Sequence, residues 1–221
     1  MATFIGIDGF PNGWVAVEID DSGRQWFGYA TSIGRLLAAA HTRAMIDMPI
    51  GLPARGFRRC DEEARMLVGP CVFTGARRDV WMFPTSQHAN EHYWADQDKG
   101  ISQQLWGLRD KLREIDEFMS PARQQTMHEA HPELIFRRLN RHSPLASKKT
   151  DAGREQRIAI LERKGLTQVR RWLGQRAHTG VGRDDLIDAC ACAIAARDAT
   201  DRLPDGVVPL DARGLRMEIW Y

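Results

Sequence analysis

FIGIDGFPNGWVAV, residues 4–17, is the stretch from which the fold of this chain is most directly inferred. An apolar run ends in Asp8, a turn containing Gly, Pro and Asn follows, and a second apolar run begins at Trp14. Short apolar runs separated by such residues are typical of a strand, a turn and a returning strand. A carboxylate at the end of a buried strand is poorly solvated and needs a hydrogen-bond partner or a cation. On this stretch alone, an aspartate that caps its own turn explains Asp8 equally well.

The remaining sequence predicts strands and helices that surround a helical insertion at residues 54–125. Apolar periodicity, helix-capping residues and turn residues mark the elements. The predicted elements are, in order, strands at 4–8, 14–19 and 24–29, a helix capped by Ser32 that runs to Ala40, a strand at 44–47, helices from Asp61 and Ser102, a strand at 127–131, helices from Pro132 and at 157–163 and 167–173, a long helix from Arg183, and an exposed strand at 215–221. We expect an α/β protein with a mixed five-stranded sheet flanked by helices, folded as a single domain over residues 1–221, with the insertion between strands four and five.

A second short apolar strand, within AMIDMPIGLP at residues 44–53, also ends in a carboxylate, Asp47. Because a helix precedes it, this strand most naturally lies parallel to the first strand, through a right-handed crossover. Asp8 and Asp47 would then lie at the carboxyl ends of their strands, on the same edge of the sheet. Open α/β sheets place their ligand sites at that edge.

The last long helix begins RDDLIDACACAIAA, residues 183–196. Asp185 and Asp188 are three residues apart, so they share one face of the helix near its start. Acids at a helix N-terminus complement the helix dipole, which is sufficient reason for one or two of them. This reason does not explain why Asp188 falls on the same face as the small apolar packing residues that follow it.

The predicted acids converge at one sheet edge, where they repel each other unless divalent cations neutralise them. Hard oxygen ligands suit Mg²⁺ or Mn²⁺ and leave coordination positions for water and phosphate oxygens. Two such ions about 4 Å apart can activate a water molecule and stabilise the leaving oxygen in phosphodiester cleavage. The predicted reaction is therefore metal-dependent hydrolysis of a nucleic acid. The predicted metal ligands and catalytic residues are Asp8, Asp47, Asp185 and Asp188.

Positive charge is concentrated in residues 136–176. That segment holds twelve Lys or Arg and three acids, a net charge of +9, whereas the whole chain carries only +2. Such a block is often solvated surface, but it is also the electrostatic footprint that binding to a phosphate backbone requires. Lys148, Lys149 and Arg154 are the candidate phosphate contacts within it, and nucleic acid is the predicted partner.

Three further candidates lie near the predicted fifth strand. His131 could carry a proton near neutral pH and contact the substrate, although a structural hydrogen bond explains this histidine equally well. Glu129 or Glu133 could add a metal ligand. An acid in the first turn of a helix is the simpler interpretation of Glu133.

The composition is that of a globular protein. Of the 221 residues, 43% are hydrophobic and 27% charged, and no apolar run approaches the roughly 20 residues that span a bilayer. The N-terminus shows no secretory signal pattern, so we expect a cytoplasmic protein with no membrane partner. The cysteines form no CxxC pair, which favours buried thiols over a zinc site or a disulfide. The C-terminal strand could pair across a homodimer.

Five motifs occur in a specific order along nearly the whole chain. They are GIDG with GWV (6–15), IDMPIGLP (46–53), EAHPE (129–133), SKKT (147–150) and DDLIDA (184–189). Together they resemble the domain of unknown function 429 family. The resemblance implies a ribonuclease H-like fold and, as the activity predicted for that family, a nuclease.

The last-helix pattern Asp185-x-x-Asp188-Ala also resembles that of bacterial Holliday-junction resolvases. By this resemblance Asp8 matches the strand-one metal ligand, and Asp185 and Asp188 match the last-helix pair. Asp47 matches the acid at the end of strand four, where the resolvases usually have Glu. Because Asp is shorter than Glu, the resemblance implies a metal that lies closer to the backbone in this chain.

Other functions stay open on sequence grounds. A non-catalytic nucleic-acid-binding or scaffold protein of the same fold predicts binding without metal-dependent cleavage. A phosphotransferase of the actin and sugar-kinase type starts with a similar hairpin, but it needs two such domains and a Gly-rich nucleotide-binding segment. A haloacid-dehalogenase-type phosphatase needs a second Asp two residues after Asp8, where this chain has Phe10.

Overall fold

The computed structural model describes residues 1–95 and 100–221. The chain divides into two compact units. Unit 1 consists of Met1–Asp47, Thr126–Asp201 and Trp220–Tyr221, and unit 2 consists of Met48–Gln125 and Arg202–Ile219. The insertion predicted at 54–125 lies within unit 2, which also takes in a segment from near the C-terminus.

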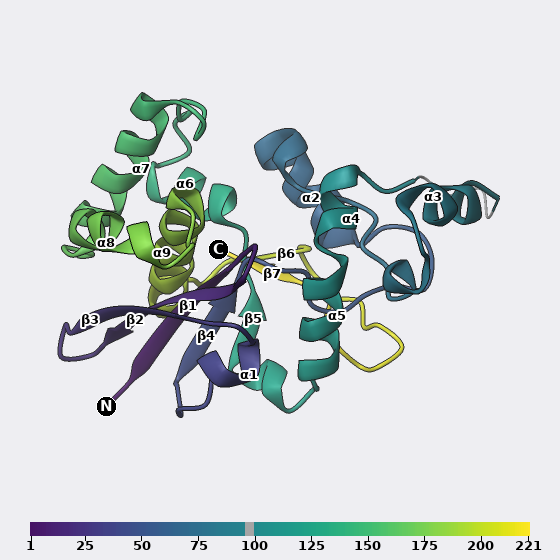
Figure 1. Ribbon diagram of the computed structural model, residues 1–221, viewed down its shortest axis with the longest axis horizontal. Helices are drawn as coiled ribbons and strands as arrows, with labels where there is room; N and C mark the ends of the chain where they lie inside the picture. Colours follow the sequence, from purple (N-terminus) through teal and green to yellow (C-terminus); the bar gives the residue numbers. More distant parts are fainter. Residues whose placement is uncertain (96–99) are drawn as a thin grey trace. The chain divides into compact units, whose positions relative to one another are not determined.

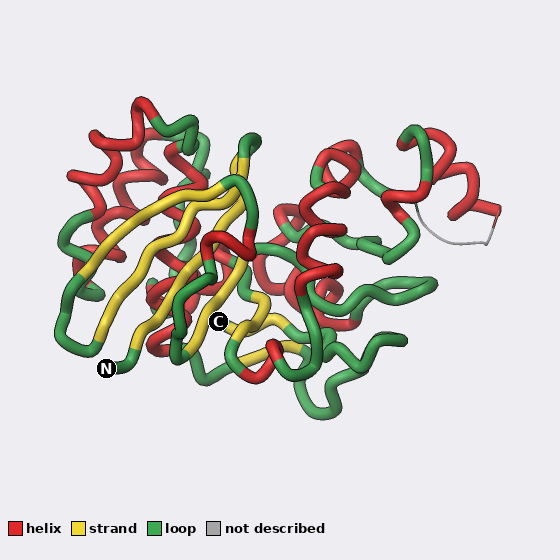
Figure 2. The backbone as a smooth tube through the Cα atoms, turned by 60° about the horizontal axis from the view of Figure 1, so that its bottom comes forward, coloured by secondary structure: helices red, strands yellow, loops and turns green. Residues whose placement is uncertain are grey.

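Unit 1 is built on a five-stranded sheet with the strand order β3-β2-β1-β4-β5 (Figure 2). The strands are β1 (Thr3–Phe10), β2 (Gly13–Asp20), β3 (Gln25–Ala30), β4 (Arg43–Ile46) and β5 (Met127–Glu129). The first three strands form an antiparallel meander, whereas β4 runs parallel to β1 and β5 parallel to β4. The mixed five-stranded sheet predicted from the sequence is confirmed, and so is the parallel pairing of the fourth strand with the first.

The register of β1 and β4 brings two acids side by side. Ile7 pairs with Ile46 across the parallel ladder, so the next residues, Asp8 and Asp47, are neighbours at the end of that ladder. The backbone N–H of Asp47 donates to the carbonyl of Ile7 at 3.0 Å, which fixes this end of the pairing. Since side chains alternate along a strand, Asp8 lies on the same face of the sheet as Gly6.

Helix α9 lies over one face of this sheet, and α6, α7 and α8 pack beside it on the same side (Figure 1). The helix bounds in unit 1 are α1 (Ile33–Leu36), α6 (Pro132–Leu139), α7 (Asp151–Arg163), α8 (Val169–Gln175) and α9 (Arg183–Asp198), with a 3-10 helix at Arg176–His178. The main core of unit 1 lies between α9 and the apolar side chains that β2 directs toward it, among them Val15, Val17 and Ile19. Every residue of α9 from Leu186 to Ala196 is buried.

The close approach of α9 to β1 depends on a glycine. A Cβ atom at Gly6 would lie 1.9 Å from the backbone N of Ala193 and 2.1 Å from the carbonyl oxygen of Ala189. The facing part of α9 consists of alternating alanine and cysteine, which leaves room for the strand. This contact brings the first turns of α9 to the carboxyl end of β1.

Among its described residues, unit 2 contains four α-helices, the strand β6 and the first residue of the strand β7, which pairs with β6. The bounds are α2 (Arg59–Val68), α3 (Ser86–Ala95), α4 (Gln103–Gly107), α5 (Arg109–Phe118), β6 (Arg202–Leu203) and β7 (Ile219–Trp220), with 3-10 helices at Gly69–Cys71, Val80–Met82 and Arg123–Gln125. None of the helices described in either unit is long and apolar enough to cross a membrane.

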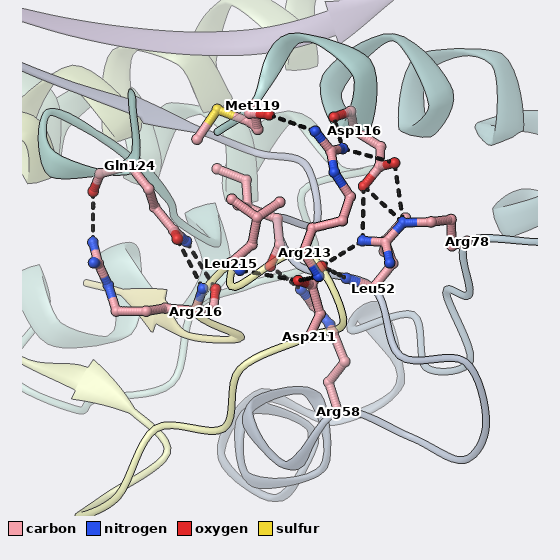
Figure 3. A network of polar contacts seen from close by, with 11 residues as sticks. Leu52, Arg58, Arg78, Asp116, Met119, Gln124, Asp211, Arg213, Leu215 and Arg216 are labelled. Carbon is pink, nitrogen blue, oxygen red and sulfur yellow. Dashed lines mark hydrogen bonds and ion pairs between the residues drawn. The ribbon is translucent and has the colours of Figure 1, made fainter. Parts of the chain in front are cut away.

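Charged side chains tie the C-terminal segment of unit 2 to α5 and the preceding loops (Figure 3). Arg78 donates to Asp116 at 3.1 Å and also bonds to Asp211. Arg213 forms an ion pair with Asp116 at 3.0 Å and donates to the Met119 carbonyl at 2.9 Å. Pairing of this kind satisfies the acids, since Asp116 and Asp211 are almost fully buried. The network links three segments of unit 2 that lie far apart in the sequence.

Several predicted elements differ from the structure, among them the helix predicted at 157–163, which begins at Asp151. The helix after Ser32 ends at Leu36, because only Ile33 of its four residues is buried, Ser32 makes no side-chain cap, and short helices are unstable without packing. The helix from Ser102 is capped as predicted, with the N–H of Leu105 donating to the Ser102 hydroxyl at 3.1 Å. It is, however, two helices, since the chain breaks between Gly107 and Arg109, where glycine disfavours helix.

The exposed strand predicted at residues 215–221 is also wrong. Only Ile219–Trp220 is strand, and Leu215, Met217 and Ile219 are buried. The alternating apolar side chains of this segment are buried, which is why the segment is not an exposed strand.

Candidate metal centre

Three aspartates from separate parts of the chain converge at the edge of the unit 1 sheet. Asp8 lies in β1, Asp47 directly follows β4, and Asp188 lies in the second turn of α9. One carboxylate oxygen of each lies within 4.8 Å of the other two. We call these three residues the aspartate cluster. Among the described residues, the aspartate cluster is the one group of three Asp, Glu, His or Cys side chains whose ligand atoms lie close enough together to hold a cation.

Two members of the aspartate cluster are buried, and Asp47 is partly exposed. Asp8 is 8% exposed and Asp188 is 4% exposed. Asp8 Oδ1 accepts the backbone N–H of Gly9 at 2.6 Å. The Oδ1 atom of Asp188, by contrast, is buried and has no hydrogen-bond partner among the described residues. A buried oxygen without a partner is costly, so it marks a position that calls for a cation or a bound water.

Burial is the largest cause that raises the pKa of every carboxyl in the cluster, and repulsion by nearby acids adds to it. The pKa of Asp8 lies well above its usual value, first because of burial and then because of the neighbouring aspartates. Burial also raises the pKa of Asp47 and of Asp188 to about 7. The charge of Lys148 lowers both of these pKa values, and that of Glu133 raises them. The site therefore has a strong preference for added positive charge.

Lys148 places an ammonium group at the cluster. Its Nζ donates to Asp188 Oδ2 at 2.8 Å, and its side chain is 37% exposed. Burial lowers the pKa of Lys148, but the charge of Asp188 and this hydrogen bond outweigh burial, so the pKa is raised overall. Lys148 is thus positively charged at neutral pH, and one of the two oxygens of Asp188 is committed to it.

Two arginines of α7 hold the segment that carries Lys148, residues 143–150, which we call the lysine loop. Arg154 donates to the carbonyl oxygens of Lys148 and of the next residue at 3.2 and 3.1 Å. Arg157, only 3% exposed, donates to the Ala146 carbonyl at 2.9 Å. Arg157 also forms an ion pair with Glu133 in which one guanidinium nitrogen donates to both carboxylate oxygens, at 2.9 and 2.7 Å. The guanidinium of Arg154, predicted as a phosphate contact, is therefore engaged with the loop itself.

The fourth predicted aspartate, Asp185, lies one turn before Asp188. Its Oδ2 accepts the backbone N–H of Gly182 at 3.1 Å, so it caps the start of α9. Asp185 is not among the three residues whose oxygens lie within 4.8 Å of each other. Its charge nevertheless raises the pKa of Asp8 and of Asp47. Asp185 therefore serves the helix and acts electrostatically on the cluster.

The other predicted residues take varied positions. His131 is the N-cap of α6, where its carbonyl accepts the first N–H groups of the helix at 3.0 and 3.1 Å. Lys149 is exposed on the lysine loop. Glu129 is 4% exposed and pairs with Ile46. Strand alternation therefore places Glu129 on the sheet face opposite the side chain of Asp47.

The sequence reasoning missed the supports of the lysine loop, Gly153 and Arg157. A Cβ atom at Gly153 would lie 2.1 Å from the carbonyl oxygen of Ser147, so glycine lets α7 lie against the loop. Thr150 could have indicated in the sequence where α7 begins. Its side chain caps α7 by accepting the N–H of Gly153 at 3.1 Å. A helix placed from Asp151 would have put Arg157 one turn after Gly153, on the same helix face.

A family model described as "Protein of unknown function (DUF429)" matches residues 6–208. The chain belongs to the DUF429 family. The match confirms the family resemblance seen in the sequence and spans the whole aspartate cluster and the lysine loop. No significant match was found to a curated protein or to a solved structure.

The donor set of this DUF429 protein fits a hard divalent cation. All ligand atoms of the cluster are carboxylate oxygens, which are the donors that Mg²⁺ and Mn²⁺ prefer. The unpartnered Oδ1 of Asp188 supplies one donor atom that nothing else in the described protein uses. Three aspartates cannot complete an octahedral shell, so positions would remain for water and for substrate oxygens.

Proposed function

We propose that this protein is a metal-dependent nuclease of ribonuclease H-like fold, which hydrolyses phosphodiester bonds in nucleic acid. The observation that carries the proposal is the buried aspartate cluster, with the Oδ1 atom of Asp188 left without a partner. Mg²⁺ or Mn²⁺ is the proposed cofactor, held by Asp8, Asp47 and Asp188. A strongly perturbed group of acids in one place is a recognised sign of a functional site.

The chemistry supplied by such a cation is Lewis acidity, which lowers the pKa of a bound water and polarises a phosphoryl oxygen. The protein's own contribution is preorganisation. The ladder between β1 and β4 holds Asp8 beside Asp47, and the contact of α9 with Gly6 brings Asp188 to them. Buried carboxylates on rigid elements need little rearrangement during a reaction. Asp185, on the same helix face, would accept a hydrogen bond from the attacking water and orient it.

Substrate binding is assigned to the basic segment that runs past the cluster. Residues 136–176 carry a net charge of +9, which suits a phosphate backbone. Lys149 is exposed beside Lys148 and is the proposed backbone contact. Arg154 acts indirectly, through its hydrogen bonds to the lysine loop.

The four free cysteines agree with the reducing conditions of a cytoplasmic location.

The deciding experiment is a cleavage assay on labelled single-stranded, duplex and four-way-junction DNA and RNA. Each substrate is incubated with Mg²⁺, Mn²⁺ or EDTA. Asp8→Asn and Asp188→Asn remove ligand charge with little change of shape. Asp184→Asn is the matched control, because Asp184 is a neighbouring acid of α9 outside the cluster. We expect cleavage that requires metal, is lost in both cluster variants and persists in the control.

The same assay addresses the alternative of a non-catalytic nucleic-acid-binding protein. That alternative predicts binding to the panel without cleavage by any variant, and equal affinity with and without metal. This pattern in protein confirmed to be folded would reject the nuclease proposal.

A further inference from the structure

We propose that the aspartate cluster binds a single divalent cation, and that the ammonium group of Lys148 fills the role a second cation would have. This inference rests on the proposed function, because it concerns the same site. It departs from the two-ion arrangement expected from the sequence. Three independent features of the site support it: its charge balance, the use of its oxygens and the support of Lys148.

The charge balance favours one ion. The three aspartates of the cluster contribute three negative charges once a cation holds them ionised. Lys148 Nζ, 2.8 Å from Asp188, contributes one positive charge. One divalent cation then neutralises these four groups, whereas two would leave them with an excess of two positive charges beside the buried Asp8 and Asp188. Uncompensated buried charge is strongly unfavourable.

The hydrogen bonds already made by the carboxylate oxygens also favour a single cation. A carboxylate that bridges two cations gives one oxygen to each. In Asp188, Oδ2 is taken by Lys148 and only the buried Oδ1 is unused. In Asp8, Oδ1 already accepts the N–H of Gly9. Of the further acids near the site, Glu133 is paired through both oxygens with Arg157, and Asp185 gives its Oδ2 to the N–H of Gly182.

The position of Lys148 is built into the fold. A flexible surface lysine would drift toward any group of acids, and its presence there would mean little. Lys148 is different, because Arg154 holds its own carbonyl and Arg157 holds the Ala146 carbonyl two residues earlier. Gly153 lets α7 pack directly against this loop. The backbone on both sides of Lys148 is thus fixed, which directs its side chain to Asp188.

The test is the number of Mn²⁺ ions bound per chain, measured by calorimetry and by the electron paramagnetic resonance signal of free Mn²⁺. Lys148→Met removes the charge and keeps an unbranched side chain. Lys148→Arg keeps the charge. Lys149→Met is the matched control, because it removes the neighbouring exposed lysine. We expect one ion in the wild type, in Lys148→Arg and in Lys149→Met, and two ions in Lys148→Met. Circular dichroism confirms that each variant is folded.

Two outcomes would overturn the inference and leave the proposed function intact: two ions in the wild type, or one ion in Lys148→Met. Asp188→Asn must abolish the counted binding, which shows that the ions lie in the cluster. Failure of every variant to bind Mn²⁺ would instead overturn the metal site itself, and with it both the proposed function and this inference. The readout does not depend on cleavage.

Discussion

Replacing Gly6 by alanine should damage both the stability of unit 1 and the metal site that we propose there. The added Cβ would lie 1.9 Å from the backbone N of Ala193 and 2.1 Å from the carbonyl oxygen of Ala189, against an ordinary contact of at least 3.4 Å. To make room, β1 and α9 must separate by about 1.5 Å at this point. Both clashing groups belong to the backbone, so rotation of a side chain cannot relieve the contact.

The expected loss of stability follows from this displacement. Overpacking a core costs roughly 1–3 kcal/mol, and a clash between two backbone segments belongs at the top of that range or above it. We therefore expect Gly6→Ala to lower the free energy of unfolding by about 3 kcal/mol or more. Asp8 lies two residues after Gly6, and Asp188 lies in the helix that must move. The separation therefore also spreads the cluster, and Mn²⁺ binding should weaken.

The assay is urea unfolding followed by circular dichroism, combined with Mn²⁺ titration under conditions in which the variant is folded. Gly174→Ala is the matched control, because an added Cβ at this position, next to the last residue of α8, would meet nothing within 4 Å. Alanine is favoured over glycine in helices by about 1 kcal/mol, so this control should be slightly more stable and should bind Mn²⁺ normally. A Gly6→Ala protein with wild-type stability and affinity would show that the cluster does not depend on the close contact of β1 with α9.

Three further predictions follow from the same contacts. Since the pKa values of Asp47 and Asp188 are raised to about 7 in the folded protein, the folded state binds more protons than the unfolded state between about pH 4 and 7. The stability of the metal-free protein should therefore fall as pH rises over that range, which thermal unfolding in EDTA measures; a rise would contradict it. Arg157→Met should cost about 3 kcal/mol, the lower end for a broken buried pair because Glu133 keeps some exposure; a loss below about 1 kcal/mol in urea unfolding would count against this. Asp185→Ala should lose about 1 kcal/mol of stability through its helix cap, whereas Asp185→Asn, which keeps an acceptor oxygen, should lose little; equal losses in both would rule out the cap.

The predictable part of the site is the part that local patterns encode. Asp8 and Asp47 each end a short apolar run, and alternation together with the crossover rule is enough to place them at one edge of a parallel pair. Asp188 could be placed on the packing face of the last helix because helical periodicity is also local. The parallel register of Ile7 with Ile46 agrees with this reasoning.

The unpredicted part depends on contacts between residues far apart in the chain. Lys148 lies 40 residues from Asp188, and Arg157 lies 24 residues from Glu133. Neither periodicity nor capping relates such positions, so the sequence marked the lysine loop as basic without showing where its charges point. The short helix after Ser32 was overestimated for a related reason, since propensity does not reveal whether a face will be buried.

The aspartate cluster works against the stability of the fold that holds it. Each carboxyl has its pKa raised chiefly by burial, which means that the ionised form is less stable in the folded protein than in water. Lys148 compensates one charge and leaves Asp188 Oδ1 without a partner. Apolar or amide side chains of similar size would fill the same space without that cost. A purely structural role therefore does not explain three aspartates at this position, whereas a cation that binds them does, because it removes the repulsion and satisfies the unpartnered oxygen in one step.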